Sequence, residues 1–192
     1  MTLEAVVLAA GEGRRLRPLT ETWPKPLLPI DRRPVIATLL RELEFAGRVT
    51  VVTGHLEDKL RRFLAPWDVT FAHQPEVLGS ADAVRRALDA GARPPILVTA
   101  ADTLYVPGAL ARFAAVFEES GAAAGMAPPA WALKEEAVPF LDDLPGPPYE
   151  LRTAFERMAE SGLHVETIEI GPTRSITTPA DLVRENFIYL ED

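Results

Sequence analysis

Basic residues and glycines gather in one short stretch of the sequence, and chemistry is expected there first. The stretch from Gly11 to Arg33 contains six basic and three acidic side chains, a net charge of +3. The whole chain carries −8, so the rest of it carries −11 once this +3 is removed. An acidic protein that concentrates positive charge in one loop is expected to bind a small anion there. Gly11 and Gly13 would let the backbone approach such an anion and point N–H groups at it.

The glycine pattern distinguishes between known kinds of phosphate loop. A Walker A loop ends in Gly-Lys-Ser/Thr, and a dinucleotide fingerprint needs a third glycine where this chain has Leu16, so neither fits. The stretch instead reads Leu8-Ala-Ala-Gly11-x-Gly13-x-Arg15-Leu16-x-Pro18-Leu-Thr20 and continues as Pro24-Lys25-Pro-Leu-Leu-Pro29. It resembles the signature of the sugar-phosphate nucleotidyltransferases, in which Gly-x-Gly-Thr-Arg-Leu-x-Pro-x-Thr is followed by Pro-Lys-x-Leu-Leu-Pro.

The resemblance implies a reaction and a first set of site residues. A nucleotidyltransferase moves a nucleoside monophosphate from a nucleoside triphosphate to a phosphorylated acceptor, here a sugar 1-phosphate, and releases pyrophosphate. The family's motif makes Arg15 and Lys25 catalytic. An arginine fork suits the pyrophosphate, whereas the point charge of a lysine suits one α-phosphate oxygen. An acceptor phosphate is mostly dianionic at pH 7, so no general base is required. The same motif assigns nucleotide binding to Ala10, Gly11 and Gly13. Arg14 stands where the family usually has threonine or serine, and it is expected either to add a second phosphate contact to the nucleotide or to be solvated.

A second motif indicates which base is bound. The residues Gln74-Pro-Glu-Val-Leu-Gly79-Ser-Ala-Asp-Ala83 resemble the base-recognition segment of glucose-1-phosphate thymidylyltransferases. This resemblance implies that Gln74 bonds the edge of a pyrimidine and that Gly79 leaves room for the nucleoside, which favours UTP or dTTP. A side-chain amide offers the donor and the acceptor that uracil and thymine require. The same segment also resembles that of glucose-1-phosphate adenylyltransferases, and Ser80 is equally explained as a helix cap.

Two positions are candidates for holding Mg²⁺, the cofactor that the resemblance implies. Asp102 follows an apolar run, where the family has a metal-binding aspartate, and the end of a strand is where a hard cation would be held. Ser175 stands where the family has its second metal ligand, but a hydroxyl is a much weaker ligand than a carboxylate. A catalytically silent nucleotide-binding relative is therefore an alternative. Thr178 and Pro179 predict a helix start, which accounts for Asp181 without a metal.

Apolar runs alternate with helical stretches along the first two thirds of the chain. The expected strands are Leu3–Ala10, Val49–Thr53, Val69–His73 and Pro95–Ala100, and the expected helices are Pro34–Ala46, Leu56–Leu64, Ser80–Ala90 and Pro107–Glu118. Four such repeats predict parallel strands joined by right-handed crossovers, that is, an α/β, Rossmann-like αβα sandwich with a mostly parallel central sheet. This is also the nucleotide-diphospho-sugar transferase fold that the resemblance implies.

The remaining third has a looser pattern. It predicts strands at Ala122–Met126 and His164–Ile170 and a connection at Pro128–Leu133. It also predicts helices at Leu151–Ser161, at Pro179–Tyr189 and at Glu135–Leu144, the last kinked or shortened by Pro139. We expect one domain over residues 1–192, with a nucleotide-binding half at 1–106 and an acceptor-binding half at 107–192.

Composition excludes several classes of protein. The chain has 192 residues, 47% of them hydrophobic, and no cysteine, which excludes disordered chains, disulfide scaffolds and thiol chemistry. The net charge of −8 argues against nucleic-acid or anionic-membrane partners. The run Ala5–Ala10 is far shorter than the roughly 20 residues of a membrane span, and Met1–Ala5 lacks a secretory signal, so a cytoplasmic protein is expected. In its short length the chain is also similar to the molybdenum-cofactor guanylyltransferase branch of the family. A non-sugar acceptor is therefore an alternative.

Overall fold

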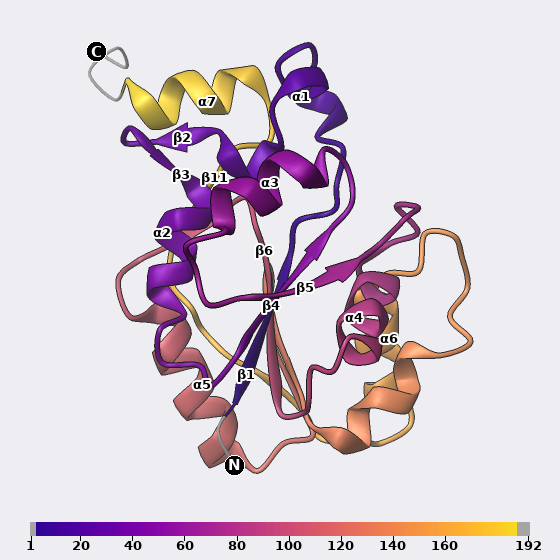
Figure 1. The fold of residues 1–192 in the computed structure, drawn as a ribbon. Coiled ribbons are helices and arrows are strands. Elements are labelled where there is room, and N and C mark those ends of the chain that lie inside the picture. The colour runs from indigo at the N-terminus through magenta and orange to yellow at the C-terminus, as the bar shows by residue number, and fades with distance from the viewer. Residues whose placement is uncertain (1–2, 188–192) are drawn as a thin grey trace.

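A seven-stranded sheet forms the centre of the molecule in a computed structural model that describes residues 3–187 (Figure 1). The strand order is β10-β8-β9-β6-β1-β4-β5. The bounds are β1 (Glu4–Leu8), β4 (Val49–Thr53), β5 (Thr70–His73), β6 (Ile96–Ala100), β8 (Ala124–Ala127), β9 (Ala130–Leu133) and β10 (Val165–Thr167). The pairs among β6, β1, β4 and β5 are parallel, as is β8 with β10, whereas β9 runs antiparallel to both of its neighbours. The predicted α/β fold with a mostly parallel sheet is therefore confirmed.

Helices cover both faces of the sheet. In Figure 1, α2 (Val35–Glu42) and α5 (Ala109–Ser120) lie to the left of the sheet, and α4 (Ser80–Asp89) and α6 (Leu151–Glu160) lie to the right. The helix α3 (Glu57–Leu64) belongs to the first group, because its Leu60 and Leu64 share a core cluster with α2 and α5. Side chains of a strand alternate between faces, so Ala5 and Val7 of β1 join the core under the first group, and Val6 joins the core under the second. Within residues 3–187, no helix combines the length and the apolar character needed to cross a membrane.

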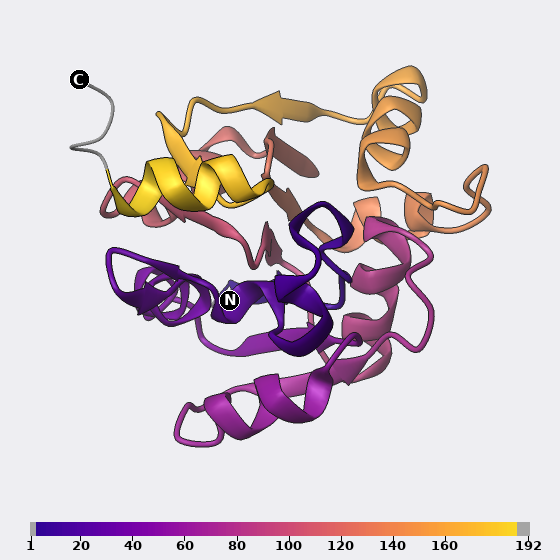
Figure 2. The same cartoon turned by 90° about the horizontal axis from the view of Figure 1, so that it is seen from above.

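Short elements gather over the carboxyl ends of the parallel strands, at the top of Figure 1. They are η1 (Arg14–Leu16), α1 (Leu19–Thr22), η2 (Lys25–Leu27), the hairpin of β2 (Pro29–Ile30) and β3 (Arg33–Pro34), the pair of β7 (Thr103–Tyr105) and β11 (Thr173–Ser175), and α7 (Pro179–Asn186). Figure 2 looks down on this edge, where α7 contacts β2. A third apolar cluster joins them, in which Leu16, Ile30, Leu104 and Ile176 are buried and Leu182 packs against the rest. Residues 14–34 and residues 173–186, far apart in the sequence, thus contribute to one layer.

Three local predictions need correction. The segment predicted as a connection contains β9, because its alternation is too short to recognise before β6 and β8 enclose it. The helix predicted at Glu135–Leu144 is a 3₁₀ helix, η3 (Glu135–Leu141), which contains Pro139. The helix predicted up to Tyr189 ends at Asn186 among the described residues, and Tyr189 lies outside them.

Candidate active site

A cavity of about 270 Å³ opens at the carboxyl ends of β1 and β6. Six of the residues singled out from the sequence line it: Gly11, Gly13, Arg14, Arg15, Lys25 and Asp102. Ala10 does not line it but is buried beside it, and Ala9 lines it instead. Parallel strands present their carboxyl ends at one edge, which is where α/β sheets bind ligands. The tertiary structure therefore brings the glycine loop and the predicted metal position into one cavity.

Lys25 and Asp102 form an ion pair across this cavity, although they are 77 residues apart in the sequence. Lys25 begins η2, and Asp102 lies in the turn between β6 and β7. Their side chains are only 16% and 24% exposed, so each charge is partly removed from water and satisfies the other. A ligand that carries both phosphate and a cation could bond both groups.

The glycine loop is packed tightly on one side and open on the other. Gly13 has φ +63°, and a Cβ there would lie 2.9 Å from Cγ2 of Thr20 and 3.3 Å from Cβ of Lys25. The Thr20 hydroxyl donates to the carbonyl oxygen of Gly13 at 2.9 Å. A Cβ built on Gly11 would meet nothing within 4 Å. The loop is therefore fixed at Gly13, while Gly11 leaves space for a ligand in the cavity.

The arginines of the loop differ in how far they are already neutralised. Glu12 accepts hydrogen bonds from Arg14 at 2.9 and 3.0 Å and from Arg17 at 3.0 Å, and the bond from Arg14 is the main reason that the pKa of Glu12 is lowered. Arg15 lines the cavity and, among residues 3–187, has no ion pair. Arg15 is thus the arginine of the loop best able to take a phosphate without first leaving a carboxylate.

Gln74 lies outside this cavity, at the end of β5. Its side chain is buried, with the residue only 2% exposed. The side-chain nitrogen donates to the carbonyl oxygen of Gly79 at 3.1 Å and to Oδ2 of Asp82 at 2.8 Å. Gln74 and Gly79 are therefore brought together, as one binding segment requires, but the amide nitrogen already has two acceptors. Base reading by Gln74 stays a prediction.

Gly79 is in contact with the backbone of Tyr149. The N–H of Tyr149 donates to the carbonyl oxygen of Leu78 at 2.7 Å, and the N–H of Ala81 donates to the carbonyl oxygen of Tyr149 at 2.9 Å. Gly79 has φ +118°, and a Cβ there would lie 2.2 Å from the oxygen of Tyr149. This close approach gives Gly79 a reason independent of any nucleoside, whose contact with it stays a prediction. Gly79, not Ser80, is the cap residue of α4, and the Ser80 hydroxyl instead donates to Glu150.

We expect Gly79→Ala to destabilise the protein more than Gly121→Ala. Gly121 also has a positive φ, +69°, but a Cβ there would meet nothing within 4 Å. Gly121 is in the left-handed helical region, where an L side chain costs about 1–2 kcal/mol. Gly79 has φ +118° and ψ 173°, a combination that is essentially restricted to glycine and costs about 1–3 kcal/mol. Only Gly79→Ala adds a clash with backbone, about 1–3 kcal/mol more. Urea unfolding of the two variants measures the difference. Equal losses of stability would show that the Tyr149 contact gives way freely.

The C-terminal segment reaches the cavity at a different residue from the one predicted. Ser175 ends β11 opposite Thr103, and the N–H of Ile176 donates to the backbone oxygen of Asp102 at 3.3 Å. Thr177 lines the cavity, whereas Ser175 is not among its lining residues. The sequence offered one clue to Thr177, its place just before a predicted helix start. The role of Ser175 as a metal ligand stays a prediction.

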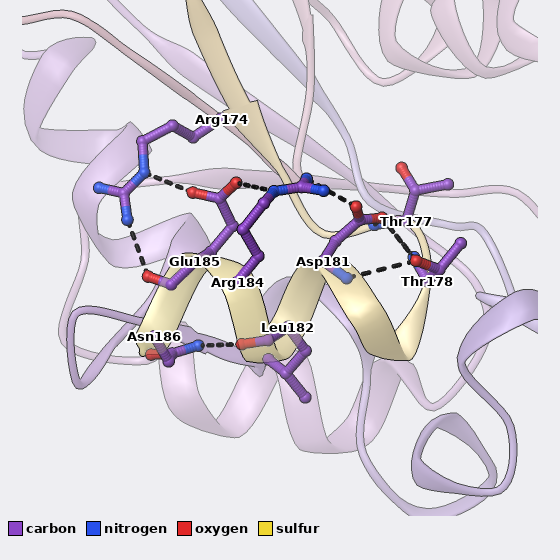
Figure 3. A network of polar contacts seen from close by, with 8 residues as sticks. All are labelled: Arg174, Thr177, Thr178, Asp181, Leu182, Arg184, Glu185 and Asn186. Atoms are coloured by element: carbon purple, nitrogen blue, oxygen red, sulfur yellow. Dashed lines mark hydrogen bonds and ion pairs between the residues drawn. The ribbon is translucent and has the colours of Figure 1, made fainter. Parts of the chain in front are cut away.

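A capping box begins α7, as Figure 3 shows. Thr178 accepts from the N–H of Asp181 at 3.3 Å, and Asp181 accepts from the N–H of Thr178 at 2.7 Å. Arg184 adds an ion pair to Asp181 at 2.7 Å. The bond from the backbone of Thr178 is the main reason that the pKa of Asp181 falls to about 2. The predicted helix start at Thr178 and the structural role of Asp181 are confirmed.

Arg174 connects α7 to the hairpin that follows Lys25. Its Nε donates to Glu185 at 2.6 Å, within the network of Figure 3, and its Nη1 donates to Asp31 at 2.8 Å. Asn186 adds a bond from its side chain to the backbone oxygen of Pro29 at 2.8 Å. No residue of α7 is fully buried, so these polar contacts, together with the packing of Leu182 against the third apolar cluster, hold the helix in place.

Comparison with known proteins decides the family. Residues 5–163 match the model of the MobA-like NTP transferase domain. The chain belongs to this family. N-acetylmuramate alpha-1-phosphate uridylyltransferase from Neisseria meningitidis serogroup B is 38% identical over 111 residues, 53% of this chain and 48% of that protein. The bifunctional protein GlmU from Burkholderia multivorans is 38% identical over 109 residues, 55% of this chain and 22% of that protein.

Solved structures share the fold of this MobA-like domain. A putative glucose-1-phosphate thymidylyltransferase from Bacillus anthracis superposes with a TM-score of 0.79 at 18% identity. The match covers 99% of this chain and 96% of that protein. The inositol-1-phosphate CTP transferase from T. maritima has a TM-score of 0.76 at 17% identity, with 94% and 91% covered. The chain spans about half the length of the first curated relative above and less of the second. The predicted resemblance to sugar-phosphate nucleotidyltransferases is confirmed.

The donor set of this MobA-like domain limits how a metal could be held. Among residues 3–187, no group of three or more His, Cys, Asp and Glu side chains could hold a metal ion. Asp102 is the carboxylate of the cavity, and Thr177 brings a hydroxyl. Mg²⁺ is usually bound by one or two carboxylates and by phosphate oxygens of the substrate. The residues present therefore fit a cation that arrives with a polyphosphate, and they do not form a separate protein cage.

Proposed function

We propose that the protein transfers a nucleoside monophosphate from a nucleoside triphosphate to a sugar 1-phosphate and releases pyrophosphate. An oxygen of the acceptor phosphate bonds to the α-phosphorus, and the bond from that phosphorus to the oxygen bridging the β-phosphate breaks. The observation that carries the proposal is the cavity in which Lys25 and Asp102 meet beside the glycine loop. One curated relative is named for a sugar phosphate, N-acetylmuramate alpha-1-phosphate, which favours a sugar acceptor over a molybdenum-cofactor acceptor.

Each residue of the cavity has a role in the proposed reaction. The loop at Gly11 and Gly13 receives the phosphates, and Arg15 bonds the departing pyrophosphate through its planar fork. Lys25 bonds an α-phosphate oxygen and neutralises the charge that develops there. Before the nucleotide binds, the Lys25 ammonium is paired with Asp102. When the α-phosphate replaces this carboxylate, the ammonium remains paired with an anion.

We propose Mg²⁺ as the cofactor, with Asp102 as its protein ligand. A bound Mg²⁺ would supply positive charge that helps to neutralise the phosphate oxygens of the substrates. The hydroxyls of Ser175 and Thr177 belong to the segment that bonds the backbone of Asp102. These hydroxyls contribute to the second side of the proposed metal site, and Asp102 holds the cation at the end of β6.

The base and the acceptor are assigned to the two halves of the chain. We propose that residues 1–106 bind the nucleotide and that Gln74 reads a pyrimidine, which favours UTP or dTTP. A relative named as a uridylyltransferase supports this preference. We assign the acceptor to residues 107–192, where a cavity of about 480 Å³ is lined by Met126, Trp131 and Phe155 among others.

The reaction run backwards tests this function without knowledge of the acceptor. The protein is incubated with Mg²⁺, labelled pyrophosphate and separate UDP-, dTDP-, ADP-, GDP- and CDP-sugars, and the labelled triphosphate is identified. Label in UTP or dTTP is expected and would support Gln74 as the base reader. Label in another triphosphate would retain the enzyme and reject that assignment. No label from any donor would contradict the sugar acceptor, and the Lys25→Ala protein controls for contaminating activity.

The Ser175→Asp variant is expected to need less Mg²⁺ for half-maximal turnover than the wild type, because a carboxylate binds a hard cation better than a hydroxyl does. Thr177→Asp is the matched comparison, since Thr177 lines the cavity. A Mg²⁺ titration of turnover for the three proteins measures the requirement. A lower requirement in Thr177→Asp alone would transfer the role to Thr177.

A further inference from the structure

The short helix α1 depends on side chains from another part of the chain. Four residues, Leu19–Thr22, form one helical turn, and the last carbonyl groups of a helix have no partners within it. Nε2 of His55 lies 2.7 Å from the carbonyl oxygen of Thr20, and the ammonium of Lys59 donates to the carbonyl oxygen of Thr22. A carbonyl oxygen only accepts, so Nε2 of His55 carries the proton of this bond. The sequence alone gave His55 no role.

His55 bonds the glycine loop at both of its ends. Its backbone N–H donates to the carbonyl oxygen of Ala10 at 3.2 Å, just before the loop, and its ring donates to Thr20 after the loop. Thr20 is 1% exposed and donates its hydroxyl to the carbonyl oxygen of Gly13. Gly13 in turn packs against Lys25. His55, in the segment after β4, therefore bonds both ends of the loop directly and is linked through Thr20 and Gly13 to the side of the cavity next to Lys25.

We propose that His55 is a positioning residue for polyphosphate binding. Its backbone and ring N–H groups hold the two ends of the loop, Ala10 and Thr20, in place. The inference rests on the proposed function, because it assumes that this loop binds phosphates. Without the ring donor, the oxygen of Thr20 loses its partner and the turn that carries Thr20 is free to shift. The carbonyl oxygen of Gly13 and the wall beside Lys25 then move with it, away from the arrangement that a polyphosphate needs.

Inorganic tripolyphosphate with Mg²⁺ is the probe, because it needs neither the base nor the acceptor to be known. Isothermal titration calorimetry compares the wild type with His55→Leu and His55→Gln. His55→Leu removes the donor and is expected to weaken binding about tenfold. His55→Gln returns an N–H near the position of Nε2 and is expected to bind within about threefold of the wild type. His164→Leu is the matched control, since His164 precedes β10 and its side chain pairs with Glu166.

Each outcome decides between the proposal and a merely structural role. Wild-type affinity in His55→Leu would overturn the inference, as would equal weakening in His55→Gln, because the N–H would then not be what matters. If His55→Leu does not fold, Thr20→Val replaces it, since it removes the bond to Gly13 while keeping the shape of the side chain. Wild-type affinity in Thr20→Val overturns the inference in the same way. No binding by the wild type would overturn the proposed function, whereas intact binding by His55→Leu overturns the inference alone.

Discussion

Lys25→Ala is expected to lower turnover by about 10³-fold while the protein stays folded. The ammonium lies in the cavity with its side chain only 16% exposed, so water cannot readily replace its charge. Arg15 is still present in this variant, but in the proposed mechanism it bonds the pyrophosphate and cannot also neutralise the charge that develops on the α-phosphate. The label-exchange reaction above, run at saturating nucleotide sugar, measures the loss.

Two further lysine variants sharpen this prediction. The chain has only three lysines, and Lys134 lies over the ring of Phe117, away from the cavity. Lys134→Ala should therefore keep wild-type turnover. Lys25→Arg keeps the charge but replaces a point charge with a planar fork, and it should recover only part of the activity. A wild-type rate in Lys25→Ala would refute the proposed role of Lys25.

Asp102→Asn is expected to lose turnover by about 10²- to 10³-fold, and raising Mg²⁺ should not restore it. The variant keeps the size of the side chain and removes the charge that would bind the cation. It also leaves the Lys25 ammonium without its carboxylate partner. Asp102→Asn should therefore bind tripolyphosphate more tightly than the wild type in the absence of metal, because no ion pair has to be exchanged.

Opposite changes in binding and turnover separate this explanation from misfolding. A misfolded variant would lose both activities, whereas Asp102→Asn is expected to lose turnover and gain metal-free binding. Asp142→Asn is the control, since Asp142 is paired with Arg85 outside the cavity. Unchanged metal-free binding in Asp102→Asn would indicate that the ion pair with Lys25 does not compete with phosphate. Full turnover in this variant would exclude Asp102 as the proposed metal ligand.

The fold was predictable where a pattern lies within one stretch of chain. The strands β1, β4, β5 and β6 are short runs rich in apolar and β-branched residues, and their alternation with helical stretches makes them recognisable from the sequence. The strand β9 was missed because its four residues are identifiable only once β6 and β8 enclose them. The same holds for β7 and β11, three residues each, which form only by pairing with one another.

The chemistry of the phosphate loop was determined by the sequence itself. Gly11, Gly13, Arg15 and Lys25 lie within fifteen residues, so their types and spacing already specify an anion-binding loop. Only the tertiary structure decided what meets that loop: Asp102 opposite Lys25, Thr177 at the cavity and His55 beneath the loop. These contacts join distant segments, and their positions depend on how the three apolar clusters pack the sheet, the helices and the upper layer together. Such packing is a property of the whole chain, which no local spacing can specify.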